Sequence, residues 1–113
     1  MTATVHSSTG TAGEPMELLR TMLEERFAVH TRRLTEFTVY GRLPDRGGFD
    51  QDTLGMLATA ARQEIADSAQ ALQRMSQGTY GICEGCHRDI PLRRLHTLPH
   101  ARRCVPCERR GSE

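Results

Sequence analysis

The sequence predicts a mainly α protein, with an antiparallel two-helix coiled-coil hairpin followed by a small C-terminal module built on four cysteines. Apolar residues recur at steps of three and four along two segments of similar length. A connection rich in glycine and proline separates these segments, and all four cysteines lie near the end of the 113-residue chain. The hydrophobic content of 37% and aromatic content of 4% are low for a globular core and ordinary for a helical hairpin.

The first helix is expected to run from Pro15 to about Tyr40. Proline suits the first turn of a helix, where a backbone N–H would have no partner. One apolar stripe follows it, made of Met16, Leu19, Leu23, Phe27, His30, Leu34 and Phe37. We interpret His30 as a tolerated residue of this seam rather than as a ligand. Residues 1–14, rich in Thr, Ser, Gly and Ala, show no periodicity and predict a disordered tail.

The second helix is expected after a tip at residues 41–50, which holds three glycines and a proline. Asp50 can cap this helix, which is expected to end before Gly78. Its seam alternates steps of four and three through Leu54, Ala58, Ala61, Ile65, Ser68, Leu72 and Met75. Folded back antiparallel, Phe37 would meet Leu54 and Met16 would meet Met75. Bulky residues of one helix would then face small residues of the other, which allows a close approach of the two helices.

The four cysteines form two C-x-x-C pairs separated by seventeen residues: Cys83, Cys86, Cys104 and Cys107. Four thiolates at this spacing suit one tetrahedral Zn²⁺ site, so we predict a four-cysteine zinc finger. About 30 residues of mixed polarity are too few to bury a core, and a structural metal would supply the missing free energy. Two disulfides would need an oxidising compartment, and a redox C-x-x-C normally begins a helix in a βαβ unit. Neither context is indicated here.

These patterns divide the chain into a hairpin at 15–78, a finger at 79–110 and a tail at 111–113. The formal charge of +1 falls to about −1 when four thiolates hold Zn²⁺, so overall charge does not favour DNA. The finger itself is basic, with seven arginines against three carboxylates. No stretch approaches the ~20 apolar residues of a membrane span, and no signal-like segment opens the chain. We therefore expect a cytoplasmic protein.

The sequence favours a binding protein over an enzyme. All four cysteines are committed to a closed metal site, and no nucleophile–base pair or phosphate-cradling glycine loop is present. The tip carries Asp45, Asp50 and Asp52 and could enter a deep channel. The alternative interpretation of the tip is a solvated turn rich in capping residues.

The finger and the residue just before it carry one specific pattern, namely Gly78-Thr79-Tyr80-Gly81-Ile82-Cys83-Glu84-Gly85-Cys86, then Ile90, Arg94, Leu95, Pro99, Ala101, Cys104 and Cys107. In these residues the finger resembles that of the DksA/TraR family of bacterial RNA-polymerase-binding regulators. The resemblance implies a monomer that inserts its hairpin into the secondary channel of RNA polymerase and alters promoter-complex stability without binding DNA. It further implies that the tip residues facing the polymerase active centre are Asp45, Arg46, Gly47 and Asp50. The arginines that would contact polymerase or nucleic acid are Arg93, Arg94, Arg102 and Arg103.

The sequence departs from the family pattern at three points, and these departures limit what the resemblance implies. The family tip reads Asp-x-x-Asp-x-Ala, whereas here the first Asp is missing, Asp45 is retained and Gly47 stands for the alanine. The glycine pair Gly47-Gly48 is also expected to loosen the tip. The family's basic ppGpp-binding positions correspond to Asp67, Leu98 and Glu108, so no ppGpp response is expected at that site. Six residues follow Cys107, too few for the long C-terminal helix of full-length members.

Two alternative functions stay open at this point. The C-x2-C-x17-C-x2-C spacing is also that of GATA-type DNA-binding fingers, and the arginines could contact phosphates. No basic tail or recognition helix is indicated in support of that interpretation. A zinc-stabilised helical adaptor is the other alternative.

Overall fold

The computed structural model describes the backbone of residues 3–112 and the side chains of residues 15–111. Its elements are α1 (Ala3–Arg42), a short 3-10 helix η1 (Arg46–Gly48), α2 (Gln51–Gln77), α3 (Leu92–Thr97) and α4 (Val105–Ser112). Over the described residues the only β-type pairing is an isolated bridge between Ile82 and Asp89. The mainly α fold is thus confirmed.

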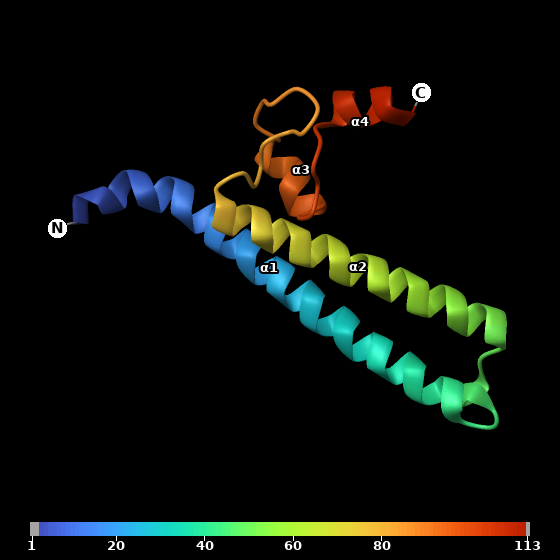
Figure 1. The fold of residues 1–113 in the computed structure, drawn as a ribbon. Helices are drawn as coiled ribbons and strands as arrows, with labels where there is room; N and C mark the ends of the chain where they lie inside the picture. The colour runs from blue at the N-terminus through green and yellow to red at the C-terminus, as the bar shows by residue number, and fades with distance from the viewer. Residues whose placement is uncertain (1–2, 113) are drawn as a thin grey trace.

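The molecule is a long hairpin with a small module at one end. Figure 1 shows α1 and α2 running side by side in opposite directions, with α3 and α4 beside the end of the hairpin that lies opposite its tip. The radius of gyration is 18.0 Å and the extents are 60 × 41 × 21 Å. A compact chain of this length would have a radius of gyration of about 13 Å. The hairpin therefore projects from its base into solvent.

The predicted seam of α2 is confirmed. Leu54, Ala61 and Ser68 are buried, and the other four predicted positions are partly buried. The capping residues are also as predicted, because Asp50 accepts a hydrogen bond from the Thr53 N–H and Gly78 ends the helix in a left-handed conformation. With 27 residues, α2 is about 40 Å long.

The seam of α1 differs from the prediction in its middle. Phe27 is 38% exposed, and the neighbouring Arg26 turns inward instead. Arg26 Nη2 donates to Glu64 Oε1 at 3.0 Å, and His30 Nε2 lies 3.8 Å from the same oxygen. The facing part of α2 offers small side chains such as Ala61, so a long polar side chain has room to cross the seam. The periodic pattern misplaced Phe27 because its edge position still fits a stripe of steps of three and four.

The beginning of α1 also differs from the prediction. The helix starts at Ala3 rather than at Pro15, so residues that were expected to form a disordered tail are helical in the structure. Met1, Thr2 and Glu113 lie outside the described residues. Adding residues to an existing helix avoids the cost of nucleation, which allows a segment without apolar periodicity to continue it. Pro15 lies inside the helix, where proline removes one backbone hydrogen bond.

The core of the molecule sits at the base of the hairpin. Leu19 and Leu23 of α1 are fully buried there beside Ala71 of α2. The finger adds the rest of this core, namely Tyr80, Cys83, Ile90, Leu95, Ala101 and Cys107. Met16 and Met75 pack against the same cluster, as the predicted register requires. The hairpin and the finger therefore share one core.

None of the described helices has both the length and the apolar character that crossing a lipid bilayer requires.

Candidate metal centre and hairpin tip

Short turns of the finger bring the two cysteine pairs together. The first pair lies in a tight loop in which the Cys83 N–H donates to the Arg88 carbonyl at 2.8 Å and the His87 N–H donates to the Cys83 carbonyl at 2.9 Å. The second pair lies at the start of α4, where the Glu108 N–H donates to the Cys104 carbonyl. A hydrogen bond from the Glu84 N–H to the Arg102 carbonyl, 2.8 Å long, joins the two segments.

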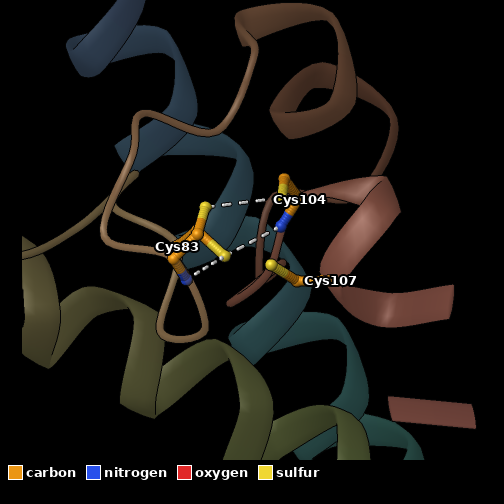
Figure 2. Close-up of side chains that lie close together, drawn as sticks. Cys83, Cys104 and Cys107 are labelled. Carbon is orange, nitrogen blue, oxygen red and sulfur yellow. Dashed lines mark hydrogen bonds between the residues drawn. The ribbon is translucent and has the colours of Figure 1, made fainter. Parts of the chain in front are cut away.

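The four sulfur atoms form a compact cluster. All four Sγ atoms lie within 4.8 Å of one another, and the Cys86 and Cys104 sulfurs are 3.9 Å apart. Tetrahedral zinc with bonds of about 2.3 Å to sulfur requires sulfur–sulfur distances of about 3.8 Å. The cysteines are free thiols rather than disulfides, and Figure 2 shows Cys83 facing Cys104 and Cys107. The donor set and its geometry fit Zn²⁺ in a closed structural site.

The protein environment favours the thiolate form of Cys83 and disfavours that of Cys107. Burial by itself raises the pKa of Cys83, but N–H groups of Cys104, Cys86 and Gly85 directed at its sulfur lower that pKa to about 5. The side-chain contact with Cys104 and burial raise the pKa of Cys107 to about 12. Thiolates at both Cys83 and Cys107 would repel each other, so ionisation of Cys107 requires a nearby cation. A divalent ion would meet that need by offsetting the repulsion between the sulfurs.

Gly85 is required by the close packing of the metal centre. A Cβ atom added at this position would lie 3.0 Å from Cys107 Sγ and 3.6 Å from Cys83 Sγ. The loop between the first two cysteines therefore runs directly against the sulfur cluster. The sequence analysis did not assign this role to Gly85, although a glycine inside a C-x-x-C pair is a signal for such an approach.

The finger is anchored to the shared core by a buried tyrosine. The Tyr80 hydroxyl donates to the Pro99 carbonyl at 2.7 Å, and burial raises the pKa of Tyr80 to about 12. His100 Nε2 lies 3.6 Å from Asp67 Oδ2, which links the finger to α2 at a second point. The hydrogen bond of Tyr80 lies within the finger, and the contact of His100 with Asp67 joins the finger to the hairpin.

At the far end, the tip carboxylates act as helix caps. Asp45 Oδ1 accepts from the Gly47 N–H at 3.1 Å and thereby caps η1. Both carboxylate oxygens of Asp50 are engaged by Thr53, whose N–H lies at 2.7 Å and whose hydroxyl lies at 3.1 Å. The hydrogen bond from the Thr53 backbone is the main reason that the pKa of Asp50 is lowered. Asp52 is exposed in the first turn of α2.

Three aromatic side chains hold the tip in one conformation. The Phe49 ring lies 5.9 Å from the Tyr40 ring and 6.5 Å from the Phe37 ring, measured between centroids. Gly47 has a φ of 64°, and an added Cβ would lie 2.9 Å from two atoms of the Tyr40 ring. Gly47 thus allows a tightly packed turn against Tyr40, whereas an added Cβ at Gly48 would meet nothing within 4 Å. The sequence analysis missed this aromatic cluster.

The three positions expected to lack ppGpp contacts lie around one pocket. Asp67, Leu98 and Glu108 line a pocket of about 370 Å³ between the finger and α2. The finger adds further residues to its wall, namely Arg94, His100, Ala101, Arg102 and Arg103. The pocket therefore combines two carboxylates with three arginines.

The four arginines predicted as contact residues all lie on the finger. Arg93, Arg102 and Arg103 are exposed. Arg94 is half-buried, and its Nε donates to the Arg103 carbonyl at 2.9 Å. Arg94 therefore supports the fold of the finger, while the other three present their charge to solvent.

Comparison with known proteins agrees with this geometry. Residues 78–110 match the family described as prokaryotic dksA/traR C4-type zinc finger. An uncharacterized protein of Aquifex aeolicus (strain VF5) is 32% identical over 98 residues, which cover 76% of this chain and 68% of that protein. General stress protein 16O of Bacillus subtilis (strain 168) is 40% identical over 47 residues, which cover 42% of this chain and only 29% of that protein.

A solved structure shares the whole architecture. Transcription factor DksA2 from Pseudomonas aeruginosa superposes with a TM-score of 0.74 over 94% of this chain and 89% of that one, at 21% sequence identity. Together, the fold and the cysteine cluster define a four-cysteine zinc finger protein with a helical hairpin. The chain belongs to the DksA/TraR family.

Proposed function

We propose that this protein is a transcription regulator that binds bacterial RNA polymerase directly. In this proposal the tip of its hairpin enters the secondary channel of the enzyme and alters the stability of promoter complexes. The supporting observation is a slender hairpin with a packed tip at one end and a four-cysteine zinc finger at the other (Figure 1), in a chain of the DksA/TraR family. The protein would act as a monomer in the cytoplasm, by contact rather than by a reaction of its own.

The dimensions of the hairpin support insertion into a channel. Each helix is about 10 Å in diameter with its side chains, so the pair is about 20 Å across. The arm formed by α2 is about 40 Å long. A channel that excludes a globular domain of this mass would therefore admit the hairpin up to its base, where the finger widens the molecule.

The tip residues Asp45, Arg46, Gly47 and Asp50 would then face the polymerase active centre. Asp45 and Asp50 would contribute negative charge while they cap η1 and α2. The aromatic packing beneath Gly47 favours binding because an ordered tip loses little conformational freedom when it docks. The tip is therefore proposed as a rigid contact rather than a flexible one.

The exposed arginines of the finger would contact the polymerase surface around the channel entrance. Arg93, Arg102 and Arg103 present positive charge beside the base of the hairpin. Charges of this kind mainly raise the rate of association and set orientation. Arg94 would contribute indirectly, through its hydrogen bond to the Arg103 carbonyl.

We propose that the regulator acts without ppGpp at the pocket between finger and hairpin. The Asp67 and Glu108 carboxylates line this pocket and offset much of the positive charge that its three arginines would offer a polyphosphate. One of the three arginines there, Arg94, is already bonded to the Arg103 carbonyl. Addition of ppGpp should therefore leave the activity nearly unchanged, and strong synergy would contradict this part of the proposal.

Site-specific crosslinking to purified core RNA polymerase tests the binding mode. A photoreactive residue at position 46 in the tip should label polymerase segments that line the active centre. The same residue at Gln70, an exposed position at the base end of α2, should label only the outer surface or nothing. Labelling of the same outer segments from both positions would rule out insertion. A shift of free duplex DNA without polymerase would instead favour a DNA-binding finger.

The role of tip charge can be separated from the role of the cap. Asp45→Asn keeps an oxygen that can accept the Gly47 N–H but removes the charge, whereas Asp45→Ala removes both. If negative charge matters, both variants should lose the effect on promoter-complex lifetime while they retain affinity for polymerase. Full activity of Asp45→Asn with loss only in Asp45→Ala would assign a purely structural role to Asp45.

A further inference from the structure

One arginine of α4 donates directly to a sulfur of the metal centre. Arg110 Nη2 lies 2.9 Å from Cys107 Sγ. The two residues are three positions apart on one helix, so their side chains share a face. The contact therefore follows from the α4 helix itself and is not a chance meeting of distant segments.

The donors around the sulfur cluster are unevenly distributed. Cys83 Sγ accepts three backbone N–H groups, from Gly85, Cys86 and Cys104, at 3.3 to 3.5 Å. Cys107 Sγ instead receives the charged guanidinium of Arg110. Hydrogen bonds from a charged donor are roughly twice as strong as neutral ones. The donor at Cys107 is thus a charged side chain, whereas the donors at Cys83 are neutral backbone groups.

The net charge of the metal centre explains why the contact between Arg110 and Cys107 is stabilising. Four thiolates around one Zn²⁺ carry a net charge of about −2. Cys107 is almost buried, so water offers its sulfur little solvation. The positive charge of Arg110 reaches the sulfur from the exposed side of α4 and offsets part of this negative charge.

We propose that Arg110 is a positioning residue of the zinc centre. It holds the Cys107 thiolate in the orientation that binds the metal and stabilises the negative charge of the loaded site. Groups in this outer position typically change metal affinity by 10- to 100-fold. The proposal concerns metal retention alone and does not depend on polymerase binding.

Zinc competition measures this effect directly. The full-length zinc-loaded protein is titrated with a chromogenic chelator, and Arg110→Met is compared with Arg109→Met. Methionine keeps an apolar side chain of similar length but removes the charge and the donor. Arg109 is the matched control, because it is an exposed arginine of the same helix and lies about 100° around the helix from Arg110. Arg110→Met should bind zinc about 10-fold more weakly, Arg109→Met should match the wild type, and Arg110→Lys should recover part of the affinity.

Alkylation of individual cysteines separates positioning from a general loosening of α4. Zinc-loaded protein is treated with iodoacetamide, and each cysteine is quantified by peptide mass spectrometry. In Arg110→Met, labelling of Cys107 should accelerate several-fold while that of Cys83, which keeps its three backbone donors, stays unchanged. Equal acceleration at both cysteines, or an Arg110→Met variant that matches Arg109→Met in affinity and labelling, would overturn the proposal.

Discussion

The distal half of the hairpin and the finger are stabilised in opposite ways. From the tip to the middle of the hairpin, two helices share a long seam in which Leu54 and Ala61 are buried and most other positions are half-buried, and the ion pair between Arg26 and Glu64 crosses it. The finger is short, and its stability depends on four sulfurs and a few fully buried side chains. Stability is thus spread over many weak contacts in one region and concentrated in a few strong ones in the other. Single substitutions should therefore cost far more at the base than near the tip.

Loss of one cysteine should have the largest effect. Cys104→Ser removes one of four ligands, and zinc binding supplies about 10–16 kcal/mol in structural sites of this type. We expect loss of the metal and unfolding of the finger, measured by native mass spectrometry and thermal melting. His96→Ala, which changes an exposed histidine of the finger, is the control and should retain zinc. A Cys104→Ser variant with bound zinc and an unchanged melt would contradict a four-cysteine site.

A pair of leucine substitutions compares the two regions of the hairpin. Leu23→Ala empties a fully buried site in the shared core and should cost about 2–5 kcal/mol. Leu34→Ala changes a half-buried residue of the distal seam and should cost clearly less. Denaturant unfolding of the zinc-loaded protein measures both values. Equal costs would mean that stability is not concentrated at the base.

The smallest expected effect is a pH dependence at the tip. The pKa of Asp50 lies below its ordinary value of 3.8, chiefly because the carboxylate accepts the Thr53 N–H. A lowered folded pKa means that this stabilisation is present above the unfolded pKa and is lost as pH falls through the folded one. Nuclear magnetic resonance titration of the Thr53 amide should therefore show a transition whose midpoint lies below pH 3.8. Asp50→Asn should abolish it, and a midpoint above that value would contradict the cap.

The sequence predicted most of the hairpin because its pattern is periodic and local. The seam of α2, the caps at Asp50 and Gly78 and the four-cysteine cluster were all predicted correctly. Each of these features depends on spacing within one segment. A repeat of three and four, a capping residue or a paired cysteine motif needs no knowledge of the rest of the fold.

The features that the sequence did not predict depend on contacts between segments. Arg26 turns inward only because Glu64 of the other helix faces it. Ala71 is buried because the finger completes the core beside α2. The order of the tip depends on Phe49 meeting the Tyr40 ring across the turn. The periodicity of apolar residues along one segment does not predict such contacts with another segment.

Because the finger and the base of the hairpin share one core, zinc bound in the finger should also stabilise the base of the hairpin. Amide hydrogen exchange with and without a zinc chelator measures this coupling. Removal of zinc should abolish protection from Tyr80 to Cys107 and also weaken it around Leu19, Leu23 and Ala71, while the distal part of α2 near Leu54 changes least. Loss of protection confined to the finger, with the base of α1 and α2 unchanged, would contradict the claim.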